Sequence, residues 1–195
     1  MLAVLLAKIC LPYLASVTGR EFLPKPPFIL AANHLSPLDP ALILSATRLP
    51  VRFLAAGHLF KRRWGFIRLY NELAIKRLGQ AIPTGPGSIT RCQEILGASG
   101  IIGIFPEGDI HPELQQDRLH TGLAIIAQQA QVPIVPVHID GSDRVWTFKK
   151  TFAPWRFRSV RIAIGKLIPP PNHPLDKNQA LAFVKKIMER IAVLH

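Results

Sequence analysis

Cysteine is scarce in this chain. Its 195 residues include only Cys10 and Cys92, which stand far apart and form neither a disulfide framework nor a metal-binding spacing. This usage fits a reducing compartment, or thiols with no special role. The histidines likewise lack the His-Glu-x-x-His spacing of a zinc-binding helix, so we expect no metal site.

Several signatures of ligand binding and catalysis are also missing. Residues 84–88 contain two glycines, but no Gly-Lys-Ser or Gly-Lys-Thr follows, which excludes a phosphate-binding P-loop. No Gly-x-Ser-x-Gly sequence occurs, so there is no nucleophile elbow. Internal repeats and low-complexity tracts are absent, and a hydrophobic content of 49% is ample for the core of one domain.

Acidic residues are half as numerous as basic ones. The chain has 12 Asp and Glu against 24 Lys and Arg, which gives a net charge of +12. Residues 1–82 carry +8, residues 83–143 carry −5 and residues 144–195 carry +9. Basic ends indicate a polyanionic partner, and the apolar content favours an anionic membrane. We expect no nucleic-acid partner, since basic runs interleaved with exposed aromatics are absent.

The first 19 residues are strongly apolar, interrupted by Lys8 and Pro12. No basic residue precedes the apolar run and no small-residue cleavage site follows it, so a signal peptide fits poorly. The length is marginal for a spanning helix, and Lys8 and Pro12 count against one. The pattern predicts an interfacial, membrane-associating helix over 1–19, followed by an α/β domain over 20–195. A helix packed on the domain fits the same pattern.

Apolar runs and helical periodicity alternate along the rest of the chain. They predict strands over 28–32, 51–55, 73–75, 101–105, 132–139 and 160–164, and helices over 39–46, 88–96, 119–129 and 176–194. This alternation is typical of an α/β fold with a largely parallel central sheet flanked by helices. Pro133 and Pro136 predict that the strand over 132–139 is incompletely paired on at least one side.

Three polar side chains follow directly after predicted strands: His34, Arg77 and Glu107. Ligands of parallel sheets gather beyond the carboxyl ends of the strands. A base, a cation and a carboxylate are therefore expected on one rim of the sheet.

His34 and Asp39 stand five residues apart between a strand and a helix. On a continuous helix, five steps of about 100° would place them about 140° apart, so they could not meet. Pro37 also disfavours a helical Ser36. The segment therefore predicts a turn that folds the Asp39 carboxylate back toward His34. A histidine held in this way has a fixed tautomer and a stabilised cation, as a general base requires.

The same residues also fit a helix cap. Ser36 and Asp39 match a capping box with Pro37 at the first helical position, or Asp39 is itself the N-cap. The two interpretations are compatible, because one carboxylate can both cap a helix and orient a histidine.

Two blocks together resemble the glycerolipid acyltransferase family, typified by 1-acylglycerol-3-phosphate acyltransferase. They are Asn33-His34-x4-Asp39 and the Phe-Pro-Glu-Gly sequence at 105–108. The sequences at 74–77 and 132–137 resemble the family's second and fourth blocks, and the similarity extends over about residues 17 to 165.

The resemblance implies acyl transfer from a thioester, acyl-CoA or acyl-carrier protein, to the hydroxyl of a lysophospholipid such as 1-acylglycerol-3-phosphate. His34 would deprotonate the hydroxyl and Asp39 would orient His34. Arg77, assisted by Lys76, would bind a phosphate. No covalent acyl-enzyme and no cofactor beyond the donor are implied.

The Phe-Pro-Glu-Gly block would contribute Glu107 and Gly108 to substrate binding. Glu107 would hydrogen-bond the acceptor's polyol or an arginine, and Gly108 would let a ligand approach the backbone closely. The expected location is the cytoplasmic face of a membrane, with peripheral or monotopic attachment.

One departure from the family pattern follows that block. Members commonly continue with a small hydroxyl residue and an arginine, whereas this chain has Asp109, Ile110 and His111. Asp109 would repel a phosphate monoester, and Arg118 is the candidate to compensate. The acceptor could instead be another lysolipid, a glycolipid or an unphosphorylated alcohol, or the domain could bind lipid or membrane without catalysis.

Overall fold

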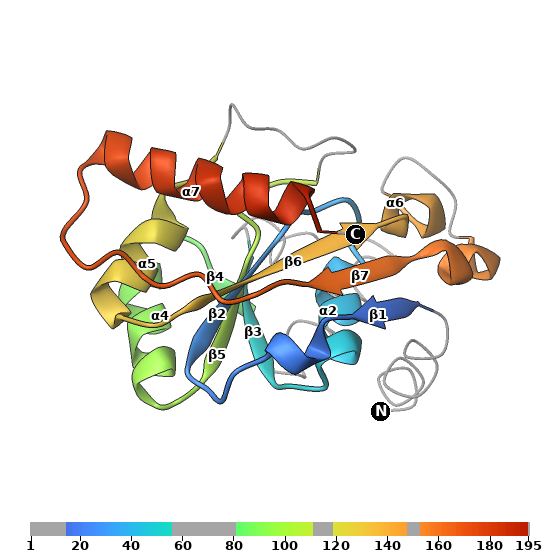
Figure 1. Cartoon of the computed structure of the whole chain (residues 1–195), viewed down its shortest axis with the longest axis horizontal. Helices are drawn as coiled ribbons and strands as arrows, with labels where there is room; N and C mark the ends of the chain where they lie inside the picture. Colours follow the sequence, from blue (N-terminus) through green and yellow to red (C-terminus); the bar gives the residue numbers. More distant parts are fainter. Residues whose placement is uncertain (1–14, 56–80, 111–118, 148–152, 195) are drawn as a thin grey trace.

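The computed structural model describes residues 15–55, 81–110, 119–147 and 153–194. Their centre is a seven-stranded sheet in the order β1-β7-β6-β2-β5-β3-β4 (Figure 1). The strands are β1 Ser16–Thr18, β2 Phe28–Ala32, β3 Val51–Ala55, β4 Ala81–Pro83, β5 Ile101–Ile104, β6 Ile134–Asp140 and β7 Arg161–Ile164.

Helices connect the strands and cover the sheet. They are α2 Asp39–Thr47, α4 Ser88–Gly97, α5 Gly122–Ala130, the short α6 Ser142–Val145 and α7 Lys177–Ala192. Two 3-10 helices, η1 Arg20–Phe22 and η5 Pro154–Ser159, complete the described elements. No helix in these parts of the chain is long and apolar enough to cross a bilayer.

The sheet is mostly parallel. Strands β6, β2, β5, β3 and β4 run in one direction, β7 runs antiparallel to β6, and β1 pairs in parallel with β7. The expected α/β fold with a largely parallel sheet and flanking helices is confirmed. The predicted strand over 73–75 lies outside the described residues.

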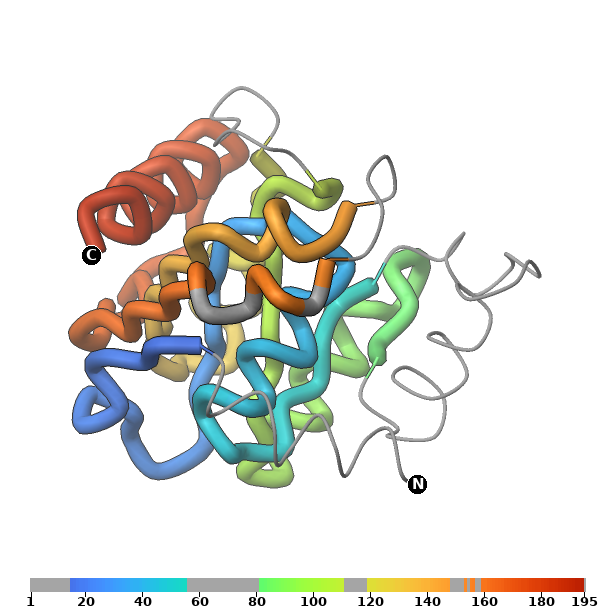
Figure 2. Tube along the Cα trace, turned by 90° about the vertical axis from the view of Figure 1, so that its right-hand side faces the viewer, coloured from blue at the N-terminus to red at the C-terminus, as the bar shows by residue number. Residues whose placement is uncertain are grey.

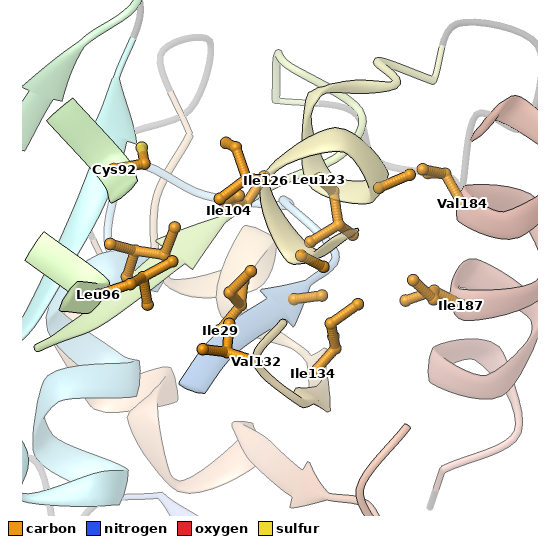
Figure 3. Close-up of a cluster of buried hydrophobic side chains, with 14 of the residues drawn as sticks. Ile29, Cys92, Leu96, Ile104, Leu123, Ile126, Val132, Ile134, Val184 and Ile187 are labelled. Atoms are coloured by element: carbon orange, nitrogen blue, oxygen red, sulfur yellow. The ribbon is translucent and has the colours of Figure 1, made fainter. Parts of the chain in front are cut away.

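Two apolar layers lie on opposite faces of the sheet. Ile29 and Ala31 of β2 belong to the layer under α4, α5 and α7 (Figure 3), and its Phe28, Leu30 and Ala32 belong to the layer on the α2 side. A side view shows α7, in red, well apart from the light-blue α2 (Figure 2). Strand β2 is thus buried on both faces, which explains its uninterrupted apolar sequence.

The predicted N-terminal helix needs a correction at its end. Residues 1–14 lie outside the described residues, but Ser16–Thr18 forms strand β1 and not the last turn of a helix. The amide of Ser16 donates to the carbonyl of Val160 at 3.0 Å, and Val17 packs partly against the α2-side core. The hydrogen bonds that β1 gains as an edge strand beside β7 outweigh the weak helical preference of a Ser-Val-Thr sequence.

The pairing of β6 is interrupted on one side, as Pro133 and Pro136 predict. The strand pairs with β2 through residues 134–137, whereas its antiparallel ladder with β7 begins at Val137, preceded by an isolated bridge between Ile134 and Ile168. Pro136 has no amide proton to donate, although its carbonyl accepts the Gly165 amide at 2.8 Å.

Candidate active site

The loop between β2 and α2 is anchored at the carboxyl end of the parallel strands. Asn33 is buried, and its side-chain amide donates to the Ile139 carbonyl at 2.8 Å. Its Oδ1 accepts the Ile139 amide, also at 2.8 Å. One side chain thereby extends the β2–β6 pairing by a residue and fixes the start of the loop that carries His34.

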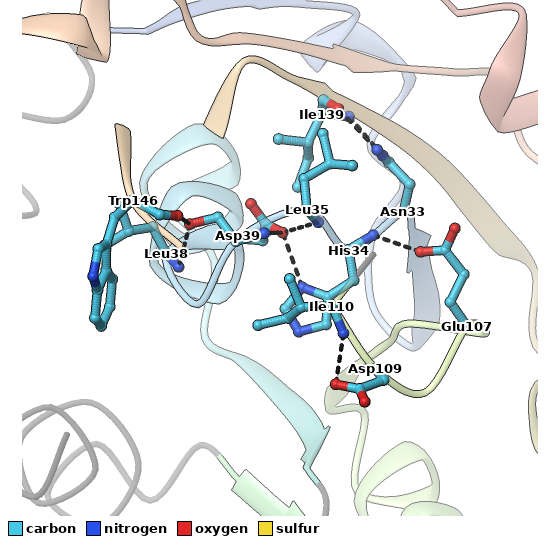
Figure 4. Close-up of polar contacts among 11 residues, drawn as sticks. Asn33, His34, Leu35, Leu38, Asp39, Glu107, Asp109, Ile110, Ile139 and Trp146 are labelled. Carbon is cyan, nitrogen blue, oxygen red and sulfur yellow. Dashed lines mark hydrogen bonds and ion pairs between the residues drawn. The ribbon is translucent and has the colours of Figure 1, made fainter. Parts of the chain in front are cut away.

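His34 and Asp39 meet as the turn predicts. His34 Nδ1 lies 2.9 Å from Asp39 Oδ2, and the side chains are 16% and 0% exposed (Figure 4). The same Oδ2 accepts the amides of Leu35 at 2.7 Å and Ser36 at 2.8 Å. Three donors around one oxygen hold the carboxylate and the imidazole in a single arrangement.

This contact determines which ring nitrogen can act as a base. The ionised carboxylate only accepts hydrogen bonds, so Nδ1 carries the proton and Nε2 keeps its lone pair. A positive charge formed at Nε2 would be stabilised by the buried carboxylate on the other side of the ring. The partly exposed His34 can therefore take a proton from a bound molecule.

The capping interpretation is wrong about the N-cap, which is neither Ser36 nor Asp39. Helix α2 begins at Asp39 after the N-cap Leu38, whose side chain forms no capping bond. Asp39 binds the Ser36 amide, and Ser36 Oγ accepts the Leu38 amide at 3.1 Å. Asp39 thus holds the turn that leads into the helix and orients His34, but it does not cap the helix.

A stack of aromatic rings supports the imidazole. The Phe105 ring lies against His34 with centroids 4.0 Å apart and planes inclined by 15°, and Phe53 lies 5.6 Å beyond Phe105. The sequence identified Phe105 only as the first residue of the Phe-Pro-Glu-Gly motif. Its position directly after a buried strand places it near the site, but does not show that its ring contacts His34.

Glu107 joins the second motif to the first. It is 3% exposed, and its Oε2 accepts the amide of His34 at 2.9 Å (Figure 4). Glu107 thus holds the backbone of the residue that carries the imidazole, and its expected hydrogen bond to the acceptor's polyol or to an arginine stays a prediction. The structure brings His34 and Glu107 together at the ends of their strands, and the turn adds Asp39.

A family model described as Acyltransferase matches residues 15–140, which is more than half of the chain and includes both motifs. The chain belongs to the acyltransferase family. The resemblance inferred from the His34 and Phe105 blocks is thereby confirmed.

Two known proteins illustrate this membership in the acyltransferase family. A probable 1-acyl-sn-glycerol-3-phosphate acyltransferase of Mycoplasma pneumoniae is 28% identical over 171 residues, 84% of this chain and 63% of that protein. This chain thus spans less than two thirds of that relative. The crystal structure of the 1-acyl-sn-glycerophosphate (LPA) acyltransferase PlsC from Thermotoga maritima matches with a TM-score of 0.71 and 23% identity, over 96% of this chain and 75% of that one. The latter likeness shows a common fold.

Gly108 of the acyltransferase motif has a close neighbour that sequence analysis missed. Its φ of 73° lies in the left-handed region, and an added Cβ would come within 2.4 Å of His120 Nε2. The backbone of His120 is fixed here because its amide donates to the Pro106 carbonyl at 2.9 Å. A residue larger than glycine at 108 would displace this imidazole, whatever ligand approaches.

The remaining predicted site residues divide into two groups. Lys76, Arg77, His111 and Arg118 lie outside the described residues, so phosphate binding by Arg77 and Lys76 stays a prediction. Asp109 is exposed, and its Oδ1 accepts the amide of Ile110 at 2.8 Å. Within the described ranges, no three His, Cys, Asp or Glu side chains are grouped as a metal site would require.

Proposed function

We propose that this protein transfers an acyl group from a thioester donor to the hydroxyl of a lysophospholipid such as 1-acylglycerol-3-phosphate, as a step of phospholipid biosynthesis. The observation that carries the proposal is the contact between His34 Nδ1 and Asp39 Oδ2, which leaves Nε2 available as a base. The donor is acyl-CoA or acyl-carrier protein, and no other cofactor is required.

The reaction needs one proton relay through His34. Nε2 removes the proton of the acceptor hydroxyl as its oxygen attacks the thioester carbonyl, and a tetrahedral intermediate forms. When that intermediate collapses, the C–S bond breaks and the imidazolium gives its proton to the departing thiolate. Asp39 stabilises the imidazolium between these two transfers.

Residues of the family's motifs bind the substrate. Arg77 with Lys76 binds the acceptor's phosphate, and the backbone at Gly108 borders the acceptor. Glu107 positions the His34 amide. The acceptor is a membrane lipid, so the protein works at the cytoplasmic face of a membrane, attached peripherally or monotopically. The name of the Mycoplasma relative supports a lysophosphatidate acceptor.

The test is acyl transfer by the purified full chain, followed by mass spectrometry of the lipid products. Oleoyl-CoA and oleoyl-acyl-carrier protein are each supplied with a panel of lysolipids and neutral alcohols. We expect His34→Ala to lower kcat by about 10²–10⁴-fold. His173→Ala is the matched control, because His173 is exposed and its ring hydrogen-bonds to the adjacent Pro174 carbonyl.

Two results would overturn this proposal. One is a folded wild type that turns over neither donor with any acceptor of the panel; lipid binding without turnover would then favour a non-catalytic lipid-binding domain. The other is His34→Ala with the same activity as His173→Ala, which would show that the imidazole is not the base.

A further inference from the structure

A cavity lies at the edge of the sheet formed by β1 and β7, away from the His34 site. It has a volume of about 730 Å³ and is lined by η1, the end of β1, the segment after β7 and the C-terminal end of α7. None of its lining residues belongs to the His34, Asp39 and Glu107 site. We call it the edge trough.

Small residues create the edge trough. Ile162 and Ile164 of β7 belong to the α2-side core, so the intervening Ala163 faces the side of the sheet that α7 covers. Thr18, Ala163 and Gly165 line the trough. A Cβ added to Gly165 would lie 2.9 Å from Leu194 and 3.0 Å from Pro136, so the floor is bounded by apolar side chains.

The edge trough also exposes large apolar side chains. Leu167 is 45% exposed and Val193 is 66% exposed, and both line the trough. In the described parts of the chain, Trp155 is the other large hydrophobic residue with comparable exposure. Two such side chains beside the edge trough indicate a surface that binds an apolar group.

Positive charge surrounds this apolar floor. Lys186 and Arg190 are exposed, and their spacing of four residues places them on one face of α7. Lys166 approaches from the segment after β7, and Glu21 is the one carboxylate among the described residues that line the trough. Three cations against one anion favour a ligand with an acidic group.

We propose that the edge trough binds an anionic amphiphile with a single acyl chain. Its acidic group lies at Lys166, Lys186 and Arg190, and its chain lies on the apolar floor beside Leu167 and Leu194. The volume falls within the range of about 300–1,000 Å³ that is usual for small-molecule sites. This site goes beyond the proposed acyl transfer, because it shares no residue with the catalytic loop.

The test follows methyl resonances of Leu167, Val193 and Leu194 by NMR while sodium oleate is added to the full chain below its micellar concentration. We expect saturable shifts at all three residues. The double variant Lys186→Glu/Arg190→Glu should weaken binding about tenfold or more, since two attractive charges become repulsive. Lys177→Glu/Lys185→Glu is the matched control: it makes the same charge change on two exposed α7 residues that do not line the trough.

Three further titrations distinguish a single anionic lipid from a neutral lipid, a free anion and a membrane surface. Oleyl alcohol with the same affinity as oleate would contradict the need for an acidic group, and inorganic phosphate with the same shifts would contradict the need for a chain. Shifts that appear only with phosphatidylglycerol vesicles would identify a membrane-contact surface and overturn a single-lipid site. Absence of oleate shifts would also overturn it.

Two controls keep the result independent of folding and of catalysis. If the double variant loses its dispersed spectrum, Leu167→Ser replaces it, with Val193 and Leu194 as reporters, and unchanged oleate affinity would then contradict the proposal. Acyl transfer is measured on the same samples. Loss of oleate binding with full transfer separates this site from the proposed active site.

Discussion

One oxygen of Asp39 makes all of the hydrogen bonds that the described structure gives its side chain. Oδ2 accepts from His34, Leu35 and Ser36, whereas the buried Oδ1 has no hydrogen-bond partner among the described residues. Two backbone amides of the loop hold this carboxylate in place independently of its contact with the imidazole. The arrangement is therefore built into the loop and does not depend on substrate.

The variant Asp39→Asn removes the negative charge of the Asp39 side chain but keeps its size and shape. The amide oxygen can still accept the Leu35 and Ser36 amides, so we expect the variant to fold. It cannot stabilise the imidazolium as an anion does, so kcat should fall by about 10²–10⁴-fold. The rate of product formation measures this. Asp176→Asn is a surface control, and equal rates for the two variants would contradict the role of the Asp39 charge.

Phe105 is a positioning residue for His34. Phe105→Leu keeps an apolar side chain but removes the flat surface that lies 4.0 Å from the imidazole. Ring pairs contribute about 0.5–1.5 kcal/mol, so kcat/KM should fall by up to about tenfold, with a changed pH–rate profile. Phe53→Leu removes a ring that packs against Phe105 on the side away from His34, so this variant should leave the pH–rate profile unchanged. Identical profiles for the wild type and Phe105→Leu would contradict positioning.

At the scale of elements, helix α7 has the clearest local start signal. The Asp176 side chain accepts the Gln179 amide at 2.8 Å, and Gln179 Oε1 accepts the Asp176 amide at 3.1 Å. This is a capping box, which satisfies two amides that the first turn leaves unpaired. Val184, Ile187 and Ile191 form the buried, apolar side of the helix. The apolar periodicity predicted this helix over 176–194, and the capping box, which was not part of that prediction, explains why the helix starts where it does.

Removing that cap should cost measurable stability. Asp176→Ala loses the side-chain acceptor, and we expect the free energy of unfolding to fall by about 1 kcal/mol in urea titrations. Asp176→Asn keeps an acceptor oxygen and should lose much less. Since none of the described hydrogen bonds of His34 and Asp39 comes from α7, activity per folded molecule should not change. A loss as large for Asn as for Ala would contradict the capping explanation.

At the scale of the whole molecule, local patterns predicted the parallel sheet and the contact of His34 with Asp39. Strands β2 and β3 were predicted with their observed bounds, because short apolar runs between turn residues are strong signals, even with the exposed Arg52 inside β3. Strand β1 was missed because its structure depends on pairing with β7, about 145 residues later in the chain. For the same reason, sequence alone could not assign Glu107 to the His34 amide or Phe105 to its ring.

A buried thiol in the core makes the stability of the whole fold depend on pH. Cys92 of α4 is fully buried, and burial raises the pKa of its thiol from 9.0 to about 11. The unfolded chain therefore loses this proton at a lower pH than the folded chain does. Between about pH 9 and pH 11, ionisation of Cys92 favours unfolding, and stability falls as the pH rises.

Comparison with Cys92→Ala isolates this effect from other groups that titrate at high pH. We expect the wild type to be the more stable protein at pH 8, because the variant leaves a small cavity in the core. That advantage should shrink steadily from pH 9 to pH 11, as measured by urea unfolding at each pH. An advantage that stays constant over this range would mean that the Cys92 thiol has the same pKa in both states, and hence that water reaches the core beneath α4.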